Sequence, residues 1–233
     1  TYPIIVGIVS FLMLFIFTSF IMPSMMESII EVGAEMPPIS QMIMKIGEFM
    51  KNYWYLVLLG IIGLGLFIRR YIKTPIGRYN KDVLVNKIPL LNKGINAIVS
   101  MRFSKALYLF VSTGFPLLQG LDYIKESLNN SIAEKAVQKA KEGIIRGETL
   151  AENLDEAKYF DPVLIQMLSI GEQTGQLENI SNQMSEFYEH EADIYLNRMV
   201  SMIEPIMIVL VGIMVAFLVI GVFLPMLSIY DAI

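Results

Sequence analysis

The densest group of chemically capable side chains in this sequence is the run Glu189-His190-Glu191, followed by Asp193. Carboxylate and imidazole groups of this kind are common ligands of a divalent metal ion. Neighbouring residues of a helix point in different directions, so a single ion could not collect all four. We therefore interpret the run as a solvated, charged helix, and a metal site is the alternative that its residue types leave open. His190 is the single histidine, which excludes a multi-histidine metal site within one copy.

Other patterns that indicate catalysis are missing from the sequence. It contains no cysteine, so a thiolate nucleophile, a disulfide and a cysteine metal site are all excluded. It has no Walker phosphate loop, no HExxH, no GxSxG elbow and no dinucleotide-binding glycine motif. We expect no catalytic residue, no cofactor, no resident metal and no enzymatic activity. A net charge of −4 argues against nucleic acid as a partner, because phosphate binding needs a basic face.

Two single glutamates have more specific settings. Glu172 follows Gly171 in a stretch ending at Gly175, which we expect to form a turn between helices. Its carboxylate either caps and holds that turn or contacts a cytoplasmic partner. Glu204 stands beside Pro205 at the edge of an apolar segment, where an acid is costly unless it reaches headgroup water or a partner. It either anchors the helix at the interface or takes part in coupling, and Pro205 either starts the span or kinks a continuous helix.

Three apolar runs must position these residues. With 55% hydrophobic residues and a mean hydropathy of +0.56, the chain is more apolar than soluble proteins are. A bilayer is crossed by a helix of roughly 20 residues, and we predict transmembrane helices at 1–23, 53–70 and 203–225. Small residues within these spans would let a neighbouring helix pack closely, although ordinary glycine tolerance or chance spacing explains them equally well. They are Gly60, Gly63, Gly212 and Ala216.

The link at 24–52 has two parts. Glu27, Glu31 and Glu35 are spaced by four and share a helical face, which is either solvated or a docking strip for a basic group. From Ile39 to Met50 apolar residues recur at the period of a helix. This predicts an amphipathic helix that lies along the membrane surface or packs on the neighbouring spans.

Basic residues indicate which segments face the cytoplasm. Seven of them follow the second span, opposed only by Asp82: Arg69, Arg70, Lys73, Arg78, Lys81, Lys87 and Lys93. Basic residues next to a span stay on the cytoplasmic side. We therefore predict that the juxtamembrane linker at 71–94 and the domain at 95–202 are cytoplasmic. The link at 24–52 and the tail at 226–233 are then extracytoplasmic. The same basic cluster would suit anionic lipid.

The region 95–202 shows no alternating strand pattern and is predicted to be a bundle of about six helices. Its turns are marked by residues that start or stop helices. The predicted stops are Gly114 and Gly147, and the predicted starts are Pro116, Ser131 as a cap, the capping box Thr149-x-x-Glu152, and Asp161-Pro162. The expected fold class is all-α: a polytopic membrane protein with three transmembrane helices and one cytoplasmic helical bundle.

Several motifs follow one another along nearly the whole chain. They are Met36-Pro37-Pro38 through Phe49 to Trp54, Lys87-Ile88-Pro89, Arg102-Phe103, Ser112-x-Gly114-Phe115-Pro116-Leu117, Gly147, Phe160-x-Pro162, Gly171-Glu172-x-x-Gly175-x-Leu177, Tyr188-Glu189, Glu204-Pro205 and Pro225. In this order they resemble the type II secretion F protein family, the inner-membrane platform proteins of type II secretion systems and type IV pili. Met36 and Phe115 replace the leucine and valine of the family pattern, and both changes are conservative.

The resemblance implies a non-enzymatic inner-membrane platform for assembly of a type IV pilus or a type II secretion pseudopilus, with its main domain in the cytoplasm. The implied partners are a cytoplasmic hexameric assembly ATPase, pilin or pseudopilin subunits, other inner-membrane assembly proteins, membrane lipid and further copies of the chain. Since the family usually has two related cytoplasmic domains, we expect another one outside this sequence. The alternative function is a small transporter or permease subunit, but these spans have almost none of the polar residues that a transport pathway needs.

The resemblance also suggests roles for particular residues. One group of residues would either contact the ATPase or another partner, or form the turns of the bundle: Arg102, Gly114, Pro116, Gly147, Gly171, Glu172 and Gly175. Membrane coupling falls on Glu189, Glu204 and Pro205.

Overall fold

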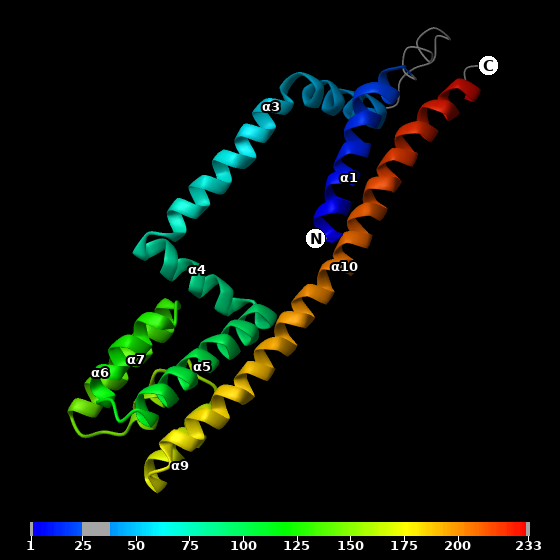
Figure 1. Ribbon diagram of the computed structural model, residues 1–233. Coiled ribbons are helices and arrows are strands. Elements are labelled where there is room, and N and C mark those ends of the chain that lie inside the picture. The colour runs from blue at the N-terminus through cyan, green and yellow to red at the C-terminus, as the bar shows by residue number, and fades with distance from the viewer. Residues whose placement is uncertain (1, 25–37, 232–233) are drawn as a thin grey trace. The chain divides into compact units, whose positions relative to one another are not determined.

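The computed structural model describes residues 2–24 and 38–231 (Figure 1). Most of these residues are helical and no strand occurs among them, which confirms the all-α prediction. The three-glutamate strip lies in residues 25–37, outside the described residues, and so do Met36 and Pro37 of the first motif of the family resemblance. The chain forms two compact units. We call 1–67 with 200–233 the membrane unit and 68–199 the bundle unit.

Among the described residues, three helices are long and apolar enough to cross a bilayer, and parts of all three make up the membrane unit. They lie at Ile5–Ser24, at Lys51–Ile72 and within Leu177–Gly221, as the three-span prediction requires. The first is built from α1 (Tyr2–Ile16) and a π-helical turn, η1 (Phe17–Ile21). The second is the later part of α3 (Pro38–Ile72), and the third belongs to α10 (Leu177–Asp231).

α3 is two helical segments joined at Tyr53. The backbone of Tyr53 is non-helical, with φ −125° and ψ 18°, so the helix bends where the apolar stretch begins. The segment before the bend corresponds to the expected amphipathic helix. Gly47 in that segment lies against the carbonyl of Thr18, and a Cβ at this position would overlap that carbonyl. The first segment of α3 therefore packs on the neighbouring span, which was one of the two expected arrangements.

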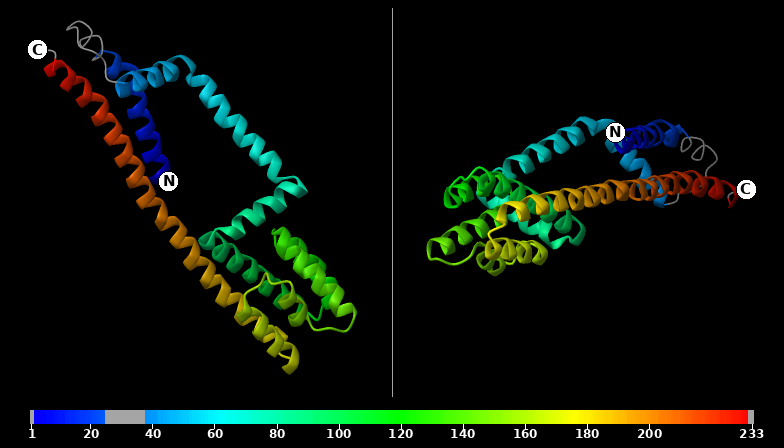
Figure 2. Two further views of the ribbon diagram at one scale, coloured as in Figure 1. Left: turned by 180° about the vertical axis from the view of Figure 1, so that it is seen from behind. Right: turned by 60° about the horizontal axis from the view of Figure 1, so that its bottom comes forward.

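α10 is a single long helix that begins in the bundle unit and ends in the membrane unit (Figure 2). Pro205 and Pro225 both lie inside it. Pro205 therefore does not start a helix, and the first-turn interpretation of this residue was wrong. Helical structure also continues to Asp231, well into the segment expected as a tail at 226–233.

The bundle unit contains seven helices among its described residues, counting the first part of α10. The other six are α4 (Pro75–Lys87), α5 (Pro89–Ser112), α6 (Leu117–Ser127), α7 (Ser131–Ile145), α8 (Leu150–Glu156) and α9 (Pro162–Thr174). Helices that follow one another from α5 to α9 pack together, and α4 packs on both α5 and α7. The segment expected as a linker at 71–94 is thus largely a helix of the bundle.

The core of the bundle unit is a single cluster of buried apolar side chains from α5 to α10. Phe103 and Phe160 meet at its centre with ring centroids 5.0 Å apart, and both are buried. Full burial of a large apolar side chain contributes about 1.5–3 kcal/mol. The buried side of α7 is made mainly of small residues, which allows close packing of its neighbours. Gly143 continues this side, where the Asn153 side chain of α8 occupies the space that a Cβ would fill.

Most helix starts agree with the sequence prediction. Thr149 and Glu152 form a capping box at α8, and Asp161 caps α9 by accepting a hydrogen bond from the Val163 N–H at 2.8 Å. The cap of α7 was predicted wrongly. Asn130, not Ser131, is the N-cap. Its side-chain oxygen accepts hydrogen bonds from the backbone N–H groups of Ile132 and Ala133 at 3.0 Å each.

Candidate partner-binding site

The up-and-down course of the helices brings three turns to one end of the bundle unit. These turns contain Gly114 between α5 and α6, Gly147 between α7 and α8, and Gly175 between α9 and α10. The alternate turns lie at the other end, where residues near Asn129 and Tyr159 contact α4 and the first half of α5. We call the first set the glycine-turn end. In Figure 1 the end of α9 and the start of α10 mark it.

All three glycines have positive φ angles, +67° at Gly114, +90° at Gly147 and +67° at Gly175. This left-handed conformation is open to glycine and strained for other residues, and it commonly ends a helix. Each of the three follows the end of a helix, as predicted for Gly114 and Gly147. Pro116 stands directly before α6, where its fixed φ suits the entry to a helix.

Gly171 was predicted to form part of the last turn, and this was wrong. It is a buried residue within α9, in the last helical turn before Thr174 ends that helix. A Cβ at Gly171 would lie 3.2 Å from the Leu177 Cα and 3.3 Å from the Ile180 side chain. The role of this glycine is therefore to let α10 pack closely on α9 as the chain reverses.

Glu172 lies in the last turn of α9, and its carboxylate caps a different helix. It accepts hydrogen bonds from the backbone N–H groups of Leu150 at 2.8 Å and Ala151 at 2.9 Å, at the start of α8. These N–H groups have no partner within their own helix, and negative charge is favoured at a helix N-terminus. Of the two interpretations of Glu172, the geometry supports capping. The capped helix start lies about twenty residues earlier in the sequence.

An exposed aromatic surface covers part of the glycine-turn end. Phe110, Phe115 and Tyr123 form a ring cluster with centroids 5.2–6.2 Å apart. Tyr123 is 59% exposed, and Leu109 and Leu118 add exposed aliphatic groups nearby in the same two helices. Contiguous exposed apolar surface rimmed by polar residues often marks a protein interaction site.

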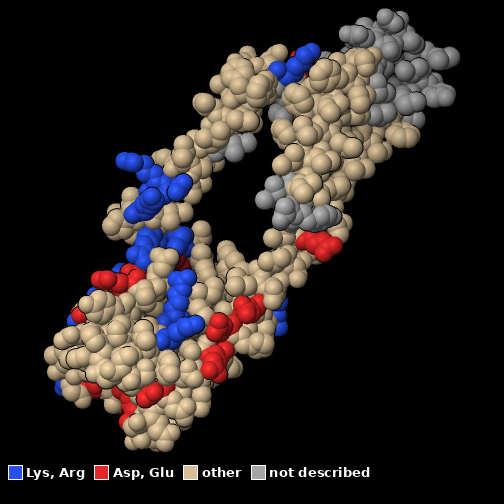
Figure 3. Space-filling view, in the orientation of Figure 1, with Lys and Arg blue, Asp and Glu red and all other residues tan. Residues whose placement is uncertain are grey.

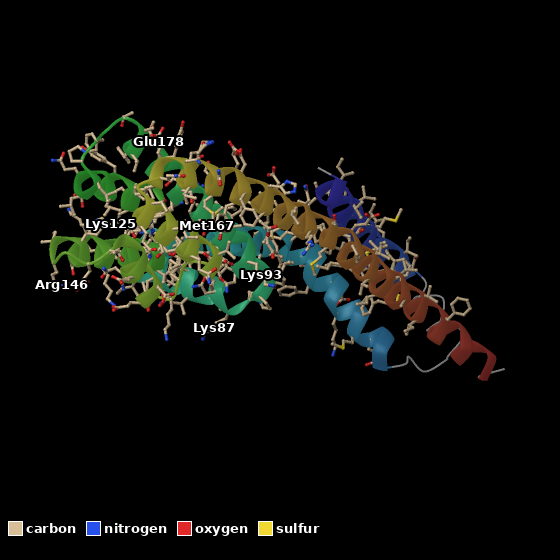
Figure 4. All side chains as sticks on the ribbon, turned by 90° about the horizontal axis from the view of Figure 1, so that it is seen from below. Lys87, Lys93, Lys125, Arg146, Met167 and Glu178 are labelled. Atoms are coloured by element: carbon tan, nitrogen blue, oxygen red, sulfur yellow. The ribbon has the colours of Figure 1, made fainter. Side chains whose placement is uncertain are left out.

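Charged residues stand on the same end. Arg146 donates hydrogen bonds to both Glu148 carboxylate oxygens at 2.9 Å, from Nε and Nη2. This pairing raises the pKa of Arg146 and lowers the pKa of Glu148, mainly through the hydrogen bonds. Both groups are exposed, so the pair contributes little stability, and Arg146 lies on the outside of the bundle (Figure 4).

Helix α4 is fastened at the opposite end of the bundle unit. Asp82 accepts hydrogen bonds from the Ser131 backbone N–H at 2.8 Å and from the Ser131 hydroxyl at 2.6 Å. Arg78 of α4 also forms an ion pair with Glu134 of α7. We call this set of contacts the α4 latch. The sequence offered one signal for it, because Asp82 is the only acid within a strongly basic segment.

The other predicted site residues do not gather at the glycine-turn end. Arg102 is exposed and donates from Nη1 to the Leu128 carbonyl at 3.4 Å, towards the α4 side. Glu189 and Glu204 are exposed at separate places along α10. In the membrane unit, a Cβ on Gly60, Gly63 or Gly212 would meet no atom within 4 Å, and Ala216 is exposed. Their role in close helix packing stays a prediction about partners outside this chain.

Charge is distributed unevenly over the bundle unit. Lys and Arg gather over the end of α3 and α4, while Asp and Glu follow the bundle part of α10 (Figure 3). Among the described residues, no group of three or more His, Cys, Asp or Glu side chains is arranged to hold a metal ion. The arrangement offers turns, caps and an exposed aromatic surface, which are suited to binding a partner.

The fold and this surface define a class of protein: an all-α membrane protein with three candidate spans and a helical bundle that presents an interaction surface. The family model described as "Type II secretion system (T2SS), protein F" matches residues 103–225. The chain belongs to the type II secretion system protein F family.

Curated relatives agree with this family. The chain is 30% identical to a type IV pilus assembly protein PilC of Thermus thermophilus over 98% of its own length, and 29% identical to one of Myxococcus xanthus over 100%. It is 25% identical to a type II secretion system protein F of Vibrio cholerae over 97% of its length. It covers 57%, 56% and 56% of these three relatives, so it spans a little over half the length of each.

Proposed function

We propose that this chain is part of a non-enzymatic inner-membrane platform on which a type IV pilus or a type II secretion pseudopilus is assembled. The observation that carries this proposal is the alignment of nearly the whole chain with proteins named for pilus assembly and type II secretion. The basic residues over the end of α3 and α4 favour a cytoplasmic position for the bundle unit.

In this proposal the glycine-turn end binds the cytoplasmic assembly ATPase. Tyr123 and Phe115 are exposed, and Phe110 behind them is half-buried against the core. The three rings come from α5, α6 and the turn between them, so a partner would meet a preformed apolar surface. Aromatic side chains are enriched in the energetically dominant parts of protein interfaces. The tight glycine turns hold this surface in place, and the exposed Arg146 adds charge at its edge.

The membrane unit would guide pilin or pseudopilin helices. An apolar cavity of about 550 Å³ between α1 and α3 is lined by side chains such as Phe11, Trp54 and Leu58. A second, of about 530 Å³ between α1 and α10, is lined by side chains such as Leu14, Leu210 and Met214. In lipid, helices associate through close packing and small residues, and the open glycines of α3 and α10 provide such positions.

α10 is the element best suited to pass movement from the bundle unit to the membrane unit. It belongs to both units and is helical from Leu177 to Asp231, so no loop interrupts it at the boundary near residue 200. Glu204 and Pro205 lie inside this helix just beyond the boundary. The coupling roles of Glu189, Glu204 and Pro205 belong to this proposal.

Copurification with the cognate assembly ATPase tests the docking surface. Tyr123→Arg places a charge in the aromatic surface, and Leu84→Arg makes the same kind of change on α4, at the other end of the unit. Tyr123 is 59% exposed and Leu84 is 63% exposed, so both variants should fold. We expect Tyr123→Arg to abolish copurification and filament assembly while Leu84→Arg retains both.

Equal binding by the two variants would refute the position of the docking surface. Normal filament assembly in cells that lack this protein would refute the platform function itself. Glu172→Lys is unsuitable as a docking variant, because it removes the cap of α8 as well as changing the surface charge.

A further inference from the structure

A polar pocket of about 240 Å³ lies within the bundle unit, away from the glycine-turn end. It is formed by the first half of α5, the start of α9 and the middle of the bundle part of α10. Lys93, labelled in Figure 4, stands at its α5 side. The residues that decide its chemistry are Asn96, Ser100, Asp161, Tyr188, Glu191 and Tyr195. None of them belongs to the docking surface proposed above.

Three polar atoms of the pocket wall lack hydrogen-bond partners among the described residues: Asn96 Oδ1, Ser100 Oγ and Tyr188 Oη. Ser100 is 0% exposed and Tyr188 is 4% exposed. Leaving such a group unsatisfied in the interior is costly, so native proteins almost always satisfy it with protein, water or a ligand. Three of them on the wall of one pocket indicate a site that is completed by another molecule.

The charges around the pocket favour a cation. Asp161 accepts the cap hydrogen bond of α9 at Oδ1, and its carboxylate also lies beside the Tyr188 hydroxyl. Glu191 forms no hydrogen bond or ion pair with any residue that the structure describes, and neither does Lys93. Lys93 is exposed and can turn its ammonium group to solvent. Two carboxylates therefore line the pocket, with Lys93 at its wall and Arg198 beside the ring of Tyr195.

The aromatic side chains narrow the choice of cation. Phe187 and Tyr195 also line the pocket, and the guanidinium group of Arg198 already lies 5.6 Å from the ring centroid of Tyr195. A guanidinium group is planar, stacks on aromatic rings and donates several hydrogen bonds in fixed directions. Burial raises the pKa of Tyr188, and the charge of Asp161 raises it further, so its hydroxyl stays neutral and can accept such a hydrogen bond.

We propose that this pocket binds the guanidinium group of an arginine side chain presented by a partner protein. The carboxylates of Asp161 and Glu191 pair with the charge, and Asn96 Oδ1 and the hydroxyls of Ser100 and Tyr188 accept its hydrogen bonds. The rings of Phe187 and Tyr195 flank its faces. The site is independent of the ATPase contact, so either can fail without the other.

The test uses the full chain in lipid nanodiscs with three small probes: N-acetyl-arginine amide, N-acetyl-citrulline amide and Nα-acetyl-lysine amide. Citrulline keeps the shape of arginine and lacks its charge, while lysine keeps the charge and lacks the planar group. Binding is followed by isothermal titration calorimetry and by NMR of labelled tyrosine. We expect saturable binding of the arginine probe, at least about tenfold tighter than either of the others. Citrulline loses the charge-assisted hydrogen bonds, and lysine loses the planar group that stacks on the rings and donates in several fixed directions.

Variants locate the binding in the pocket. Asp161→Asn keeps the cap of α9, since asparagine caps as well as aspartate, and Glu191→Gln and Tyr188→Phe keep the side-chain shape. Each of these variants should bind the arginine probe roughly tenfold more weakly than the wild type does. Glu189→Gln, an exposed neighbour on α10 outside the pocket, should leave it unchanged. Equal affinity for the citrulline or lysine probe, no saturable binding of any probe, or binding unaffected by all three pocket variants would overturn the proposal.

Discussion

Replacing Asp82 by alanine tests whether the α4 latch holds α4 to the bundle. Asp82 is 3% exposed and receives two hydrogen bonds from Ser131, so alanine leaves the backbone N–H and hydroxyl of Ser131 without their acceptor. Hydrogen bonds to a charged group contribute at least about 1.5 kcal/mol each. The Lys81 ammonium, 3.0 Å away but 38% exposed, adds less than about 1 kcal/mol. We therefore expect a loss of about 3 kcal/mol.

Hydrogen–deuterium exchange of the full chain in nanodiscs measures this loss where it occurs. About 3 kcal/mol corresponds to roughly 100-fold faster exchange of the protected amides of α4, if they exchange by opening of the latch. The calorimetric midpoint of the bundle should fall by roughly 10 °C. Ser131→Ala keeps the backbone hydrogen bond and should show about half the effect. Glu126→Ala removes an exposed carboxylate on α6 and should show almost none.

The effect should depend on pH in a defined direction. Burial by itself would raise the pKa of Asp82, but the hydrogen bonds from Ser131 and the nearby Lys81 outweigh it, and the pKa lies below its ordinary value of 3.8. A carboxyl group with a lowered folded-state pKa adds stability above its unfolded pKa and loses it as the pH falls through the folded value. The difference between wild type and Asp82→Ala should be complete at pH 7 and shrink below about pH 4. If α4 of Asp82→Ala exchanged at pH 7 no faster than α4 of the control Glu126→Ala, the proposed role of the α4 latch would be refuted.

Three further predictions concern other parts of the chain. Glu172→Ala should destabilise α8 by about 1–2 kcal/mol, because two backbone N–H groups lose a charged cap, and Glu172→Gln should have a smaller effect. Faster hydrogen–deuterium exchange confined to α8 would confirm this prediction, and unchanged exchange would contradict it. Gly143→Ala should cost about 1–3 kcal/mol in thermal unfolding, since its Cβ would overlap the buried Asn153 side chain, and an unchanged midpoint would show that the site can relax. In the cysteine-free chain, a membrane-impermeant maleimide should label Asn52→Cys in whole cells and Ser127→Cys only after lysis; the reverse pattern would invert the proposed topology.

Local sequence patterns were sufficient for the spans and for most helix ends. The length of the apolar runs predicted the three spans, because a bilayer demands that length whatever the rest of the chain does. Thr149 with Glu152, and Asp161 before Pro162, predicted the starts of α8 and α9 correctly. These signals act within one turn of helix, so no distant residue is needed to interpret them.

The errors occurred where a distant residue decides between two local possibilities. Asn130 and Ser131 are both good caps, and Ser131 lost that role because its hydroxyl and backbone N–H bind Asp82, 49 residues earlier. Gly171 and Gly175 are both glycines near a turn, but only Gly175 has a positive φ, while Gly171 makes room for Leu177. Sequence spacing gave no means of separating these roles.

The sequence by itself determined that this is an all-α membrane protein of the type II secretion system protein F family, because apolar length, helix caps and ordered motifs are local properties of the chain. Only the tertiary structure decided that Glu172 caps α8, that three glycine turns and an aromatic surface share one end, and that Asn96, Ser100 and Tyr188 line one pocket. The physical reason is that these arrangements depend on which helices pack side by side, and residues far apart in sequence meet only after the core has formed.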